Sequence, residues 1–381
     1  MPPRCVVRNC ETTDERVRQF LVEGRIRLML ARNISFIRDE PRRSRDEFLP
    51  MQHQILETRP FGRLLRITEQ GSAPKGPPVL VLAPLSGHGL PLLFDMIGGL
   101  VLDHDVHVLE WSDARDVPVG AGGFGLEDNI SYAAYFLEQL GGGAHLIGLC
   151  QSALPALAAA AFLEGEGSLA APQTLTLIGG KIDTKVNPAR VDQLSRSRPL
   201  AWYEKNAISK VQAPNQGHGR QVYAAELQRT MLLTYLSRQM MSGGELLTKV
   251  LYDDGLDPAG HPFGDAFLDL IDLPAEWYLE TMALVFQSSA LPEGGLRCRG
   301  IKIDPACIRR TALLTIEGER DDIAPPGQTR IAHKFCPHIP EPRRQHYTQR
   351  RSGHFSLFHG PIWRNQILPL IRDFIWRAGL P

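Results

Sequence analysis

Residues 145–153 read HLIGLCQSA, and this stretch decides how the rest of the chain is interpreted. The apolar run 146–149 predicts a buried strand, Cys150 follows it directly, and the Ala/Leu-rich run 153–163 predicts a helix. A sharp strand-to-helix turn of this kind, a nucleophile elbow, lifts one reactive side chain above a sheet. The usual form is Gly-x-Ser-x-Gly. Here Gly148 is kept, Cys150 stands at the nucleophile position, and Ser152 and Ala153 follow. The surrounding sequence must therefore show whether this stretch is a nucleophile elbow.

Composition restricts the classes of function. The 381 residues include 42 basic and 42 acidic side chains, so a net charge of zero argues against nucleic acid or an anionic membrane as partner. We expect a cytoplasmic protein, because no signal peptide and no apolar run of about 18 residues is visible. The six cysteines lie far apart and lack paired metal-site spacings, which predicts free thiols, no metal and no cofactor.

Strands and helices are expected to alternate on either side of the elbow. Residues 54–67 predict a hairpin, and further strands are predicted at 79–84, 106–111, 146–149 and 174–179, with helices at 92–102, 126–140 and 153–163 between them. The pattern resumes with a strand at 312–318, a helix at 327–335, a strand at 344–349 and a helix at 363–376. This alternation predicts an α/β fold with a mostly parallel sheet flanked by helices.

The domain organisation follows from where the alternation stops. Residues 1–50 predict one peripheral helix, at about 15–32, and a linker; an amphipathic membrane or surface anchor is the alternative. The core is assigned to 51–182 and 306–381. Residues 183–305 show helical patterns and aromatic residues without a convincing strand, so we expect a large helical insertion that serves as a lid.

Three chemically competent residues each follow a predicted strand. Cys150 is followed by an acid in the segment 319–323 and by His354, which is the chain order nucleophile, acid, histidine of an α/β-hydrolase. The histidine would take the thiol proton and the carboxylate would orient the imidazole. Asp321 is favoured as the acid, and the adjacent Asp322 stays open.

An oxyanion hole is expected from backbone donors. The N–H of Gln151, which follows the nucleophile, should pair with an N–H near Leu85 and Ser86, after the first core strand.

Each of these residues also has a plain structural interpretation. A single Cys at the end of an apolar strand is usually a core residue, a Gly-His pair near the end of a chain is usually a turn, and adjacent aspartates often cap a helix. Asp113 and Arg115 are expected to form a pair that holds a loop. The joint occurrence of the three candidates, in order and each after a strand, favours catalysis.

Several longer motifs resemble a known family. In chain order, these motifs are Ala83-Pro84-Leu85-Ser86-Gly87-His88, Trp111-x-Asp113-Ala114-Arg115-x-Val117-Pro118, Cys150-Gln151, Gly217-His218-Gly219-Arg220-x-Val222-Tyr223, Ala275-Glu276-x-Tyr278-Leu279-x-Thr281, Glu317-Gly318-Glu319-x-Asp321-Asp322-Ile323 and Gly353-His354. From about Phe61 onward the chain thus resembles the intracellular polyhydroxyalkanoate (poly-3-hydroxybutyrate) depolymerases, which are cysteine-nucleophile α/β-hydrolases. The resemblance implies a triad of Cys150, Asp321 and His354, a polyester substrate cleaved through an acyl-thioester, and association with the surface of polymer granules.

Other functions share the same elbow chemistry. A polyhydroxyalkanoate synthase-like acyltransferase or a (thio)esterase is one alternative, and a catalytically silent granule-associated protein is another. The sequence leaves a homo-oligomer open.

Overall fold

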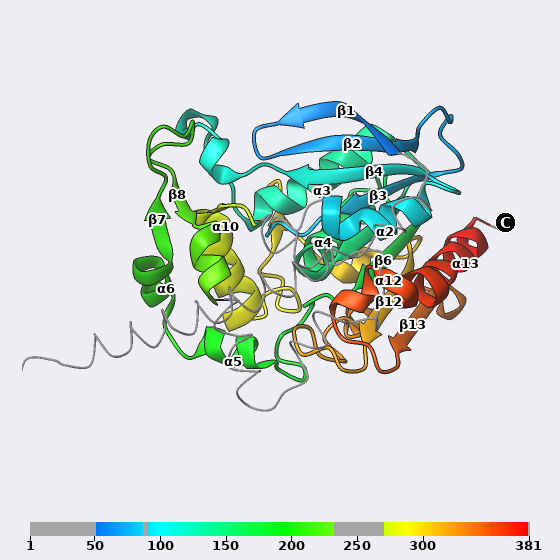
Figure 1. Cartoon of the computed structure of the whole chain (residues 1–381). Helices are drawn as coiled ribbons and strands as arrows, with labels where there is room; N and C mark the ends of the chain where they lie inside the picture. Colours follow the sequence, from blue (N-terminus) through cyan, green and yellow to red (C-terminus); the bar gives the residue numbers. More distant parts are fainter. Residues whose placement is uncertain (1–50, 87–89, 232–269, 380–381) are drawn as a thin grey trace, which may run out of the picture.

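The computed structural model describes residues 51–86, 90–231 and 270–379, and it is built around one eight-stranded sheet (Figure 1). The strand order is β1-β2-β4-β3-β5-β6-β12-β13. The strands are β1 Met51–Arg59, β2 Gly62–Glu69, β3 Pro78–Leu82, β4 Asp105–Trp111, β5 His145–Leu149, β6 Thr174–Ile178, β12 Ala312–Gly318 and β13 Arg344–Gln349. The elbow strand β5 is central and fully buried.

The sheet is antiparallel at one edge and parallel elsewhere. The pairs β1–β2 and β2–β4 are antiparallel, which confirms the predicted hairpin. The pairs from β4 through β3, β5, β6 and β12 to β13 are all parallel. The ends of β5, β12 and β13 therefore lie along one edge of the sheet, where open α/β sheets collect their functional loops.

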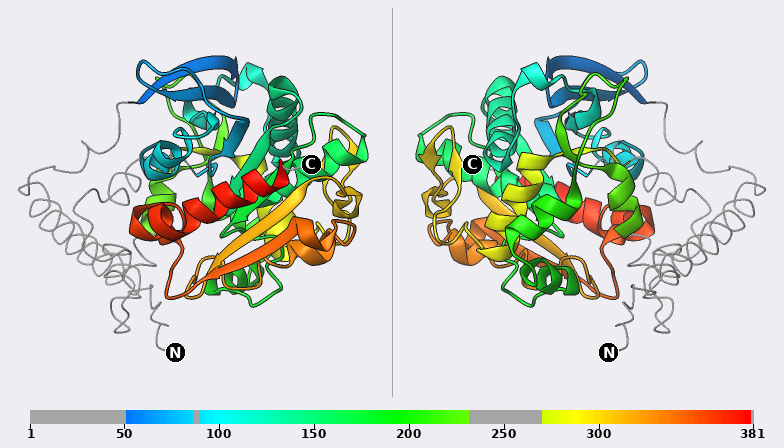
Figure 2. Two further views of the ribbon diagram at one scale, coloured as in Figure 1. Left: turned by 90° about the vertical axis from the view of Figure 1, so that its right-hand side faces the viewer. Right: turned by 90° about the vertical axis from the view of Figure 1, so that its left-hand side faces the viewer.

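Helices cover both faces, as the alternation predicts. The larger ones are α2 Leu90–Leu100, α3 Leu126–Leu140, α4 Ala153–Gly165 and α13 Leu368–Ala378. The connection from β3 to β4 through α2 crosses the sheet in the opposite direction from the connections through α3 and α4. Because such connections are right-handed, α2 lies on the other face of the sheet. In Figure 2, α13 (red) crosses one face, and Gly99 of α2 lies so close to it that an added Cβ would meet Leu368 Cδ2 at 2.5 Å.

Two predicted boundaries need correction. The helix expected over 327–335 is confined to α11 Ala332–Phe335, because the buried carboxylate of Glu317 accepts the N–H groups of Gly327, Thr329 and Arg330 and holds them in turns. The helix expected over 363–376 begins with a π-helical turn, η9 Trp363–Ile367, before α13.

The insertion contains strands as well as helices. Its described elements are α5 Arg190–Arg196, α6 Leu200–Ala207, β7 Ile208–Lys210, β8 Gln221–Tyr223, β9 Leu273–Pro274, α10 Ala275–Glu280, the π-helical η5 Thr281–Gln287, β10 Arg297–Cys298 and β11 Ile301–Lys302. The described part of the insertion is therefore helical as expected, but it also contains short strands that the sequence did not predict. Strands of two or three residues are too short to show an alternating pattern, so they leave no signal in the sequence.

Shorter turns complete the described chain: η2 Ala114–Asp116, η3 Val119–Ala121, η4 Cys150–Ser152, η6 Pro305–Cys307, η7 Glu341–Arg343, η8 Phe355–Leu357 and α12 Gly360–Ile362. The predicted helix at 15–32 lies outside the described residues, as does part of the insertion, 232–269. Within the described ranges, no helix is long and apolar enough to cross a membrane.

Candidate active site

Cys150 lies at the sharp turn between β5 and α4. It is half-buried and has a backbone φ of 48°, in the left-handed region that residues other than glycine seldom adopt. It opens the short turn η4, and α4 begins three residues later, at Ala153. Strained backbone of this kind persists where the surrounding structure enforces it, typically at functional sites.

Close packing of small residues enforces the turn. A Cβ on Gly148 would lie 2.6 Å from the Cβ of Ala156, and one on Gly180 would lie 2.1 Å from the Cβ of Ala153. Ser152 occupies the place where elbows usually have a second glycine. Its buried hydroxyl donates to the carbonyl oxygen of Ala83 at 2.5 Å, which gives the extra side chain a partner.

His354 follows β13 and is almost completely buried. Phe355 and Phe358 approach its ring edge-on, with centroids at 5.4 and 5.1 Å. Gly179, at the end of β6, lies against the same ring: a Cβ there would be 3.2 Å from His354 Cε1. A Cβ on the next residue, Gly180, would lie 3.5 Å from the carbonyl oxygen of Cys150. The two glycines after β6 therefore contact both the histidine and the elbow.

Asp321 is the carboxylate that backs the histidine. Its Oδ2 lies 2.7 Å from His354 Nδ1, and its Oδ1 accepts the N–H groups of Ile323 and Ala324 at 2.9 and 2.8 Å. Asp321 is 3% exposed, whereas Asp322 is half-buried. The bond to Nδ1 leaves the other ring nitrogen, Nε2, available to the thiol.

The electrostatics of the site favour a charged imidazole. Burial by itself would lower the pKa of His354, but the charges of Asp321 and Cys150, together with hydrogen bonds to both, raise that pKa well above its ordinary value. The imidazole thus interacts with the carboxylate on one side and with the thiol on the other, an arrangement that allows proton transfer between sulfur and nitrogen.

The predicted oxyanion donors lie beside the elbow. Leu85 and Ser86 are buried, and the N–H of Ser86 donates to Oε1 of the Gln151 side chain at 3.1 Å. Gln151 is itself exposed to solvent. Sequence reasoning considered only its backbone, and nothing in the sequence indicates that its side-chain amide reaches the loop after β3.

Two other motifs have structural roles. Arg220 donates to the carbonyl oxygens of Val117, Pro118 and Gly122, at 2.9, 2.6 and 2.9 Å. Arg115 and Asp113 form the expected ion pair, at 2.7 Å. These contacts hold the loop after β4 in place. The motif residues Gly87 and His88 lie outside the described residues.

The remaining described cysteines differ from Cys150 in their surroundings. Cys150, Cys298, Cys307 and Cys336 are all free thiols. Burial raises the pKa of Cys298 and Cys307, and raises that of Cys336 to about 12. No group of metal ligands is present among the residues that the structure describes.

Comparisons with known proteins identify the fold and the family of the chain. The fold resembles a hydrolase from Pseudomonas aeruginosa PA01, with a TM-score of 0.50, 16% identity, and 85% of this chain and 98% of that chain covered. It also resembles a protein described as a non-heme bromoperoxidase, BpoC, from Mycobacterium tuberculosis H37Rv, with a TM-score of 0.52, 14% identity, and 86% and 99% covered. These likenesses confirm the α/β-hydrolase fold, while no curated protein matches significantly. A protein-family model described as "PHB de-polymerase C-terminus" matches residues 179–379, more than half of the chain, and the protein therefore belongs to the PHB depolymerase family of the α/β-hydrolase superfamily.

Proposed function

We propose that this hydrolase cleaves the ester bonds of poly-3-hydroxybutyrate or a related polyhydroxyalkanoate, with Cys150 as nucleophile, His354 as general base and acid, and Asp321 as the group that orients the histidine. The observation that carries the proposal is the hydrogen-bonded chain from Asp321 through His354 to Cys150 at a strained strand-to-helix turn.

The first half of the reaction forms an acyl-enzyme. His354 Nε2 takes the thiol proton, and the sulfur attacks the ester carbonyl carbon. The tetrahedral intermediate then expels the alkoxide of the leaving chain, which takes the proton from the imidazolium. Asp321 stays ionised throughout, because its role is to hold Nδ1–H and to stabilise the charged ring.

The second half regenerates the thiol. Water gives a proton to His354 as its oxygen attacks the thioester carbonyl, and the Cys150 thiolate leaves. The product is a hydroxyacid or an oligomer with a new carboxyl end. Finally, the imidazolium returns its proton to the sulfur.

The oxyanion formed in both halves requires preorganised donors. The N–H groups of Gln151 and of Ser86, beside Leu85, are assigned to it. Because Ser86 N–H already donates to the Gln151 side chain, that amide must move away when a substrate carbonyl arrives. The Gln151 side chain is exposed, so its displacement into water costs little.

Exposed apolar residues on the insertion support a water-insoluble substrate. Val191 and Leu194, three residues apart on α5, are 45% and 50% exposed, and Trp202 on α6 is 44% exposed. Figure 1 places α5 and α6 at the end of the molecule remote from α13. We assign this surface to contact with the polyester, and residues 183–305 to the lid.

The test compares two cysteine variants on amorphous poly-3-hydroxybutyrate particles. Cys150→Ala should lower the rate of acid release by at least about 10³-fold. Cys307→Ala, at another half-buried free thiol, should keep the rate of the unaltered protein. Unchanged hydrolysis by a folded Cys150→Ala protein would overturn the assignment.

A second assay separates depolymerase from acyltransferase. The protein is incubated with native granules and, in parallel, with 3-hydroxybutyryl-coenzyme A. We expect soluble hydroxyacid from the granules, whereas polymer growth from the thioester would favour the synthase-like alternative.

A further inference from the structure

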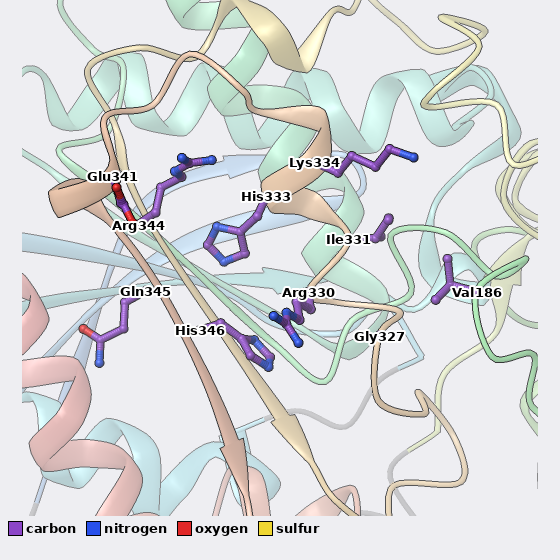
Figure 3. Close-up of a pocket in the computed structure, with 10 residues that line it drawn as sticks. All are labelled: Val186, Gly327, Arg330, Ile331, His333, Lys334, Glu341, Arg344, Gln345 and His346. Carbon is purple, nitrogen blue, oxygen red and sulfur yellow. The ribbon is translucent and has the colours of Figure 1, made fainter.

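A second candidate site, a pocket, lies outside the proposed triad, over the edge of the sheet formed by β12 and β13. Its volume is about 510 Å³, within the usual range of small-molecule sites. It is lined by Val186, Gly327, Arg330, Ile331, His333, Lys334, Glu341, Arg344, Gln345 and His346 (Figure 3). None of these residues contributes to the proposed ester hydrolysis.

The charge of this pocket is unbalanced. Three cationic side chains line it, Arg330, Lys334 and Arg344, against one carboxylate, Glu341. None of the three cations has an ion-pair partner within the described part of the chain. Figure 3 shows the His333 ring between Arg344 on one side and Arg330 on the other.

Two histidines form the floor and are held by a buried threonine. Thr315 Oγ1 lies 2.9 Å from His333 Nε2 and 2.8 Å from His346 Nδ1. A single hydroxyl proton satisfies this arrangement when one imidazole donates and the other accepts, which both can do in the neutral state. His346 Nε2 is also paired, with Thr348 Oγ1 at 3.0 Å, so the imidazoles bond within the protein and the site offers a ligand the positive charge of its arginines and lysine.

The other end of the pocket holds two apolar side chains. Val186 and Ile331 lie there, away from Arg344 and Glu341, and Lys334 lies beside Ile331 (Figure 3). A ligand that fills the pocket would thus place an anionic group by the cations and an uncharged organic part against these two side chains. An excess of cations suits the dianionic phosphate group, for which arginine offers planar paired donors.

From Arg330 and Arg344 on either side of His333, which have no ion-pair partner in the described part of the chain, and from Val186 and Ile331 at the other end, we propose that this pocket binds a small organic phosphate monoester. The pocket also touches the segment that carries Asp321. Glu317 accepts the N–H groups of Gly327, Thr329 and Arg330, and lies 3.7 Å from His346 Nε2. A ligand bound at Arg330 and Gly327 would therefore contact the turns that Glu317 holds at 327–330.

Calorimetry at constant ionic strength tests the proposal with phenyl phosphate and AMP as probes, and with inorganic phosphate, phenol and 3-hydroxybutyrate for comparison. At least one monoester should bind more tightly than all three comparison compounds. The double variant Arg330→Ala/Arg344→Ala should weaken that binding at least about 10-fold. The matched double variant Lys302→Ala/Arg309→Ala, which removes two exposed cations elsewhere, should not.

Hydrogen exchange supplies a readout that does not depend on the variants. The ligand should slow exchange of the amides at Gly327, Thr329 and Arg330 in the unaltered protein and equally in Cys150→Ala, so that the result is independent of the proposed hydrolysis. Failure of both monoesters to bind, tighter binding of free phosphate or 3-hydroxybutyrate, or equal weakening by the control variant would overturn the proposal.

Discussion

Histidines occupy two regions at the β12–β13 side of the sheet, His354 buried and His333 and His346 half-buried, and their surroundings have opposite electrostatic effects. His354 contacts a carboxylate and a thiol, and its pKa is raised. At the second pocket, burial, the neighbouring His346 and the cation Arg344 lower the pKa of His333 to about 4. The pKa of His346 is also lowered, by burial and by Arg330, although Glu317 opposes this.

The comparison shows that burial does not decide the charge of a histidine here; its partners do. Desolvation acts against the imidazolium in both regions. His354 bonds directly to Asp321 at 2.7 Å and its charged form is favoured, whereas Glu317, 3.7 Å from His346 Nε2, does not outweigh the burial of that ring. The charged form is the one that a general acid requires. The proposed triad is therefore distinguished by the direct hydrogen bond to Asp321 rather than by the presence of a histidine.

The largest expected effect comes from removing that carboxylate. Asp321→Asn should lower kcat by about 10⁴-fold, because the imidazole loses its orientation and the charge that stabilises its protonated form. The pKa of His354 should fall, which histidine NMR would follow across the pH range. This variant would make His354 resemble His333.

The adjacent aspartate provides the control. Asp322→Asn removes the same charge one residue away and should leave both kcat and the His354 titration nearly unchanged. If Asp322→Asn proves the more damaging of the two, the assignment of the acid is reversed.

A smaller effect is expected at Gln151. The side chain of Gln151→Glu would accept the Ser86 N–H as a carboxylate, and charge-assisted hydrogen bonds are roughly twice as strong as neutral ones. It should therefore compete with the substrate carbonyl and lower kcat/KM about 10-fold, while Gln151→Ala should have little effect or raise kcat/KM slightly. Equal losses in both variants would instead indicate that the amide contacts the substrate.

The stability of the protein should depend on pH in opposite ways through the two regions. His354, with a raised folded pKa, contributes stability that is fully present below its unfolded value of about 6.5 and is lost as pH rises through the folded value. His333, with a lowered folded pKa, contributes stability at neutral pH that is lost as pH falls from about 6.5 toward about 4.

Urea unfolding at pH 7 and pH 5 can isolate the second contribution. The unaltered protein should lose unfolding free energy over this interval, and His333→Gln should lose less of it, since glutamine takes up no proton. An identical loss in both proteins would show that His333 does not contribute to the pH dependence of stability.

Much of the fold follows from the sequence because its signals are local. The buried strands and helices of the core have long apolar or periodic runs, and β12 was predicted with its observed bounds, 312–318. The short strands of the insertion carry no such signal, and the turns at 327–331 depend on Glu317, a partner ten or more residues away. The positions of Cys150, Asp321 and His354 were predicted from their order after strands. The side-chain contact of Gln151 and the second pocket arise only from packing between distant segments.

The most direct test of Cys150 as the nucleophile is mass spectrometry of the protein quenched in acid during turnover of a soluble 3-hydroxybutyrate oligomer. We expect a hydroxyacyl group on the peptide that contains Cys150, accumulating further when His354→Gln slows its hydrolysis, and absent from Cys150→Ala. Continued turnover with no acyl group on Cys150 at any quench time, or with an acyl group on another residue, would rule out Cys150 as the nucleophile.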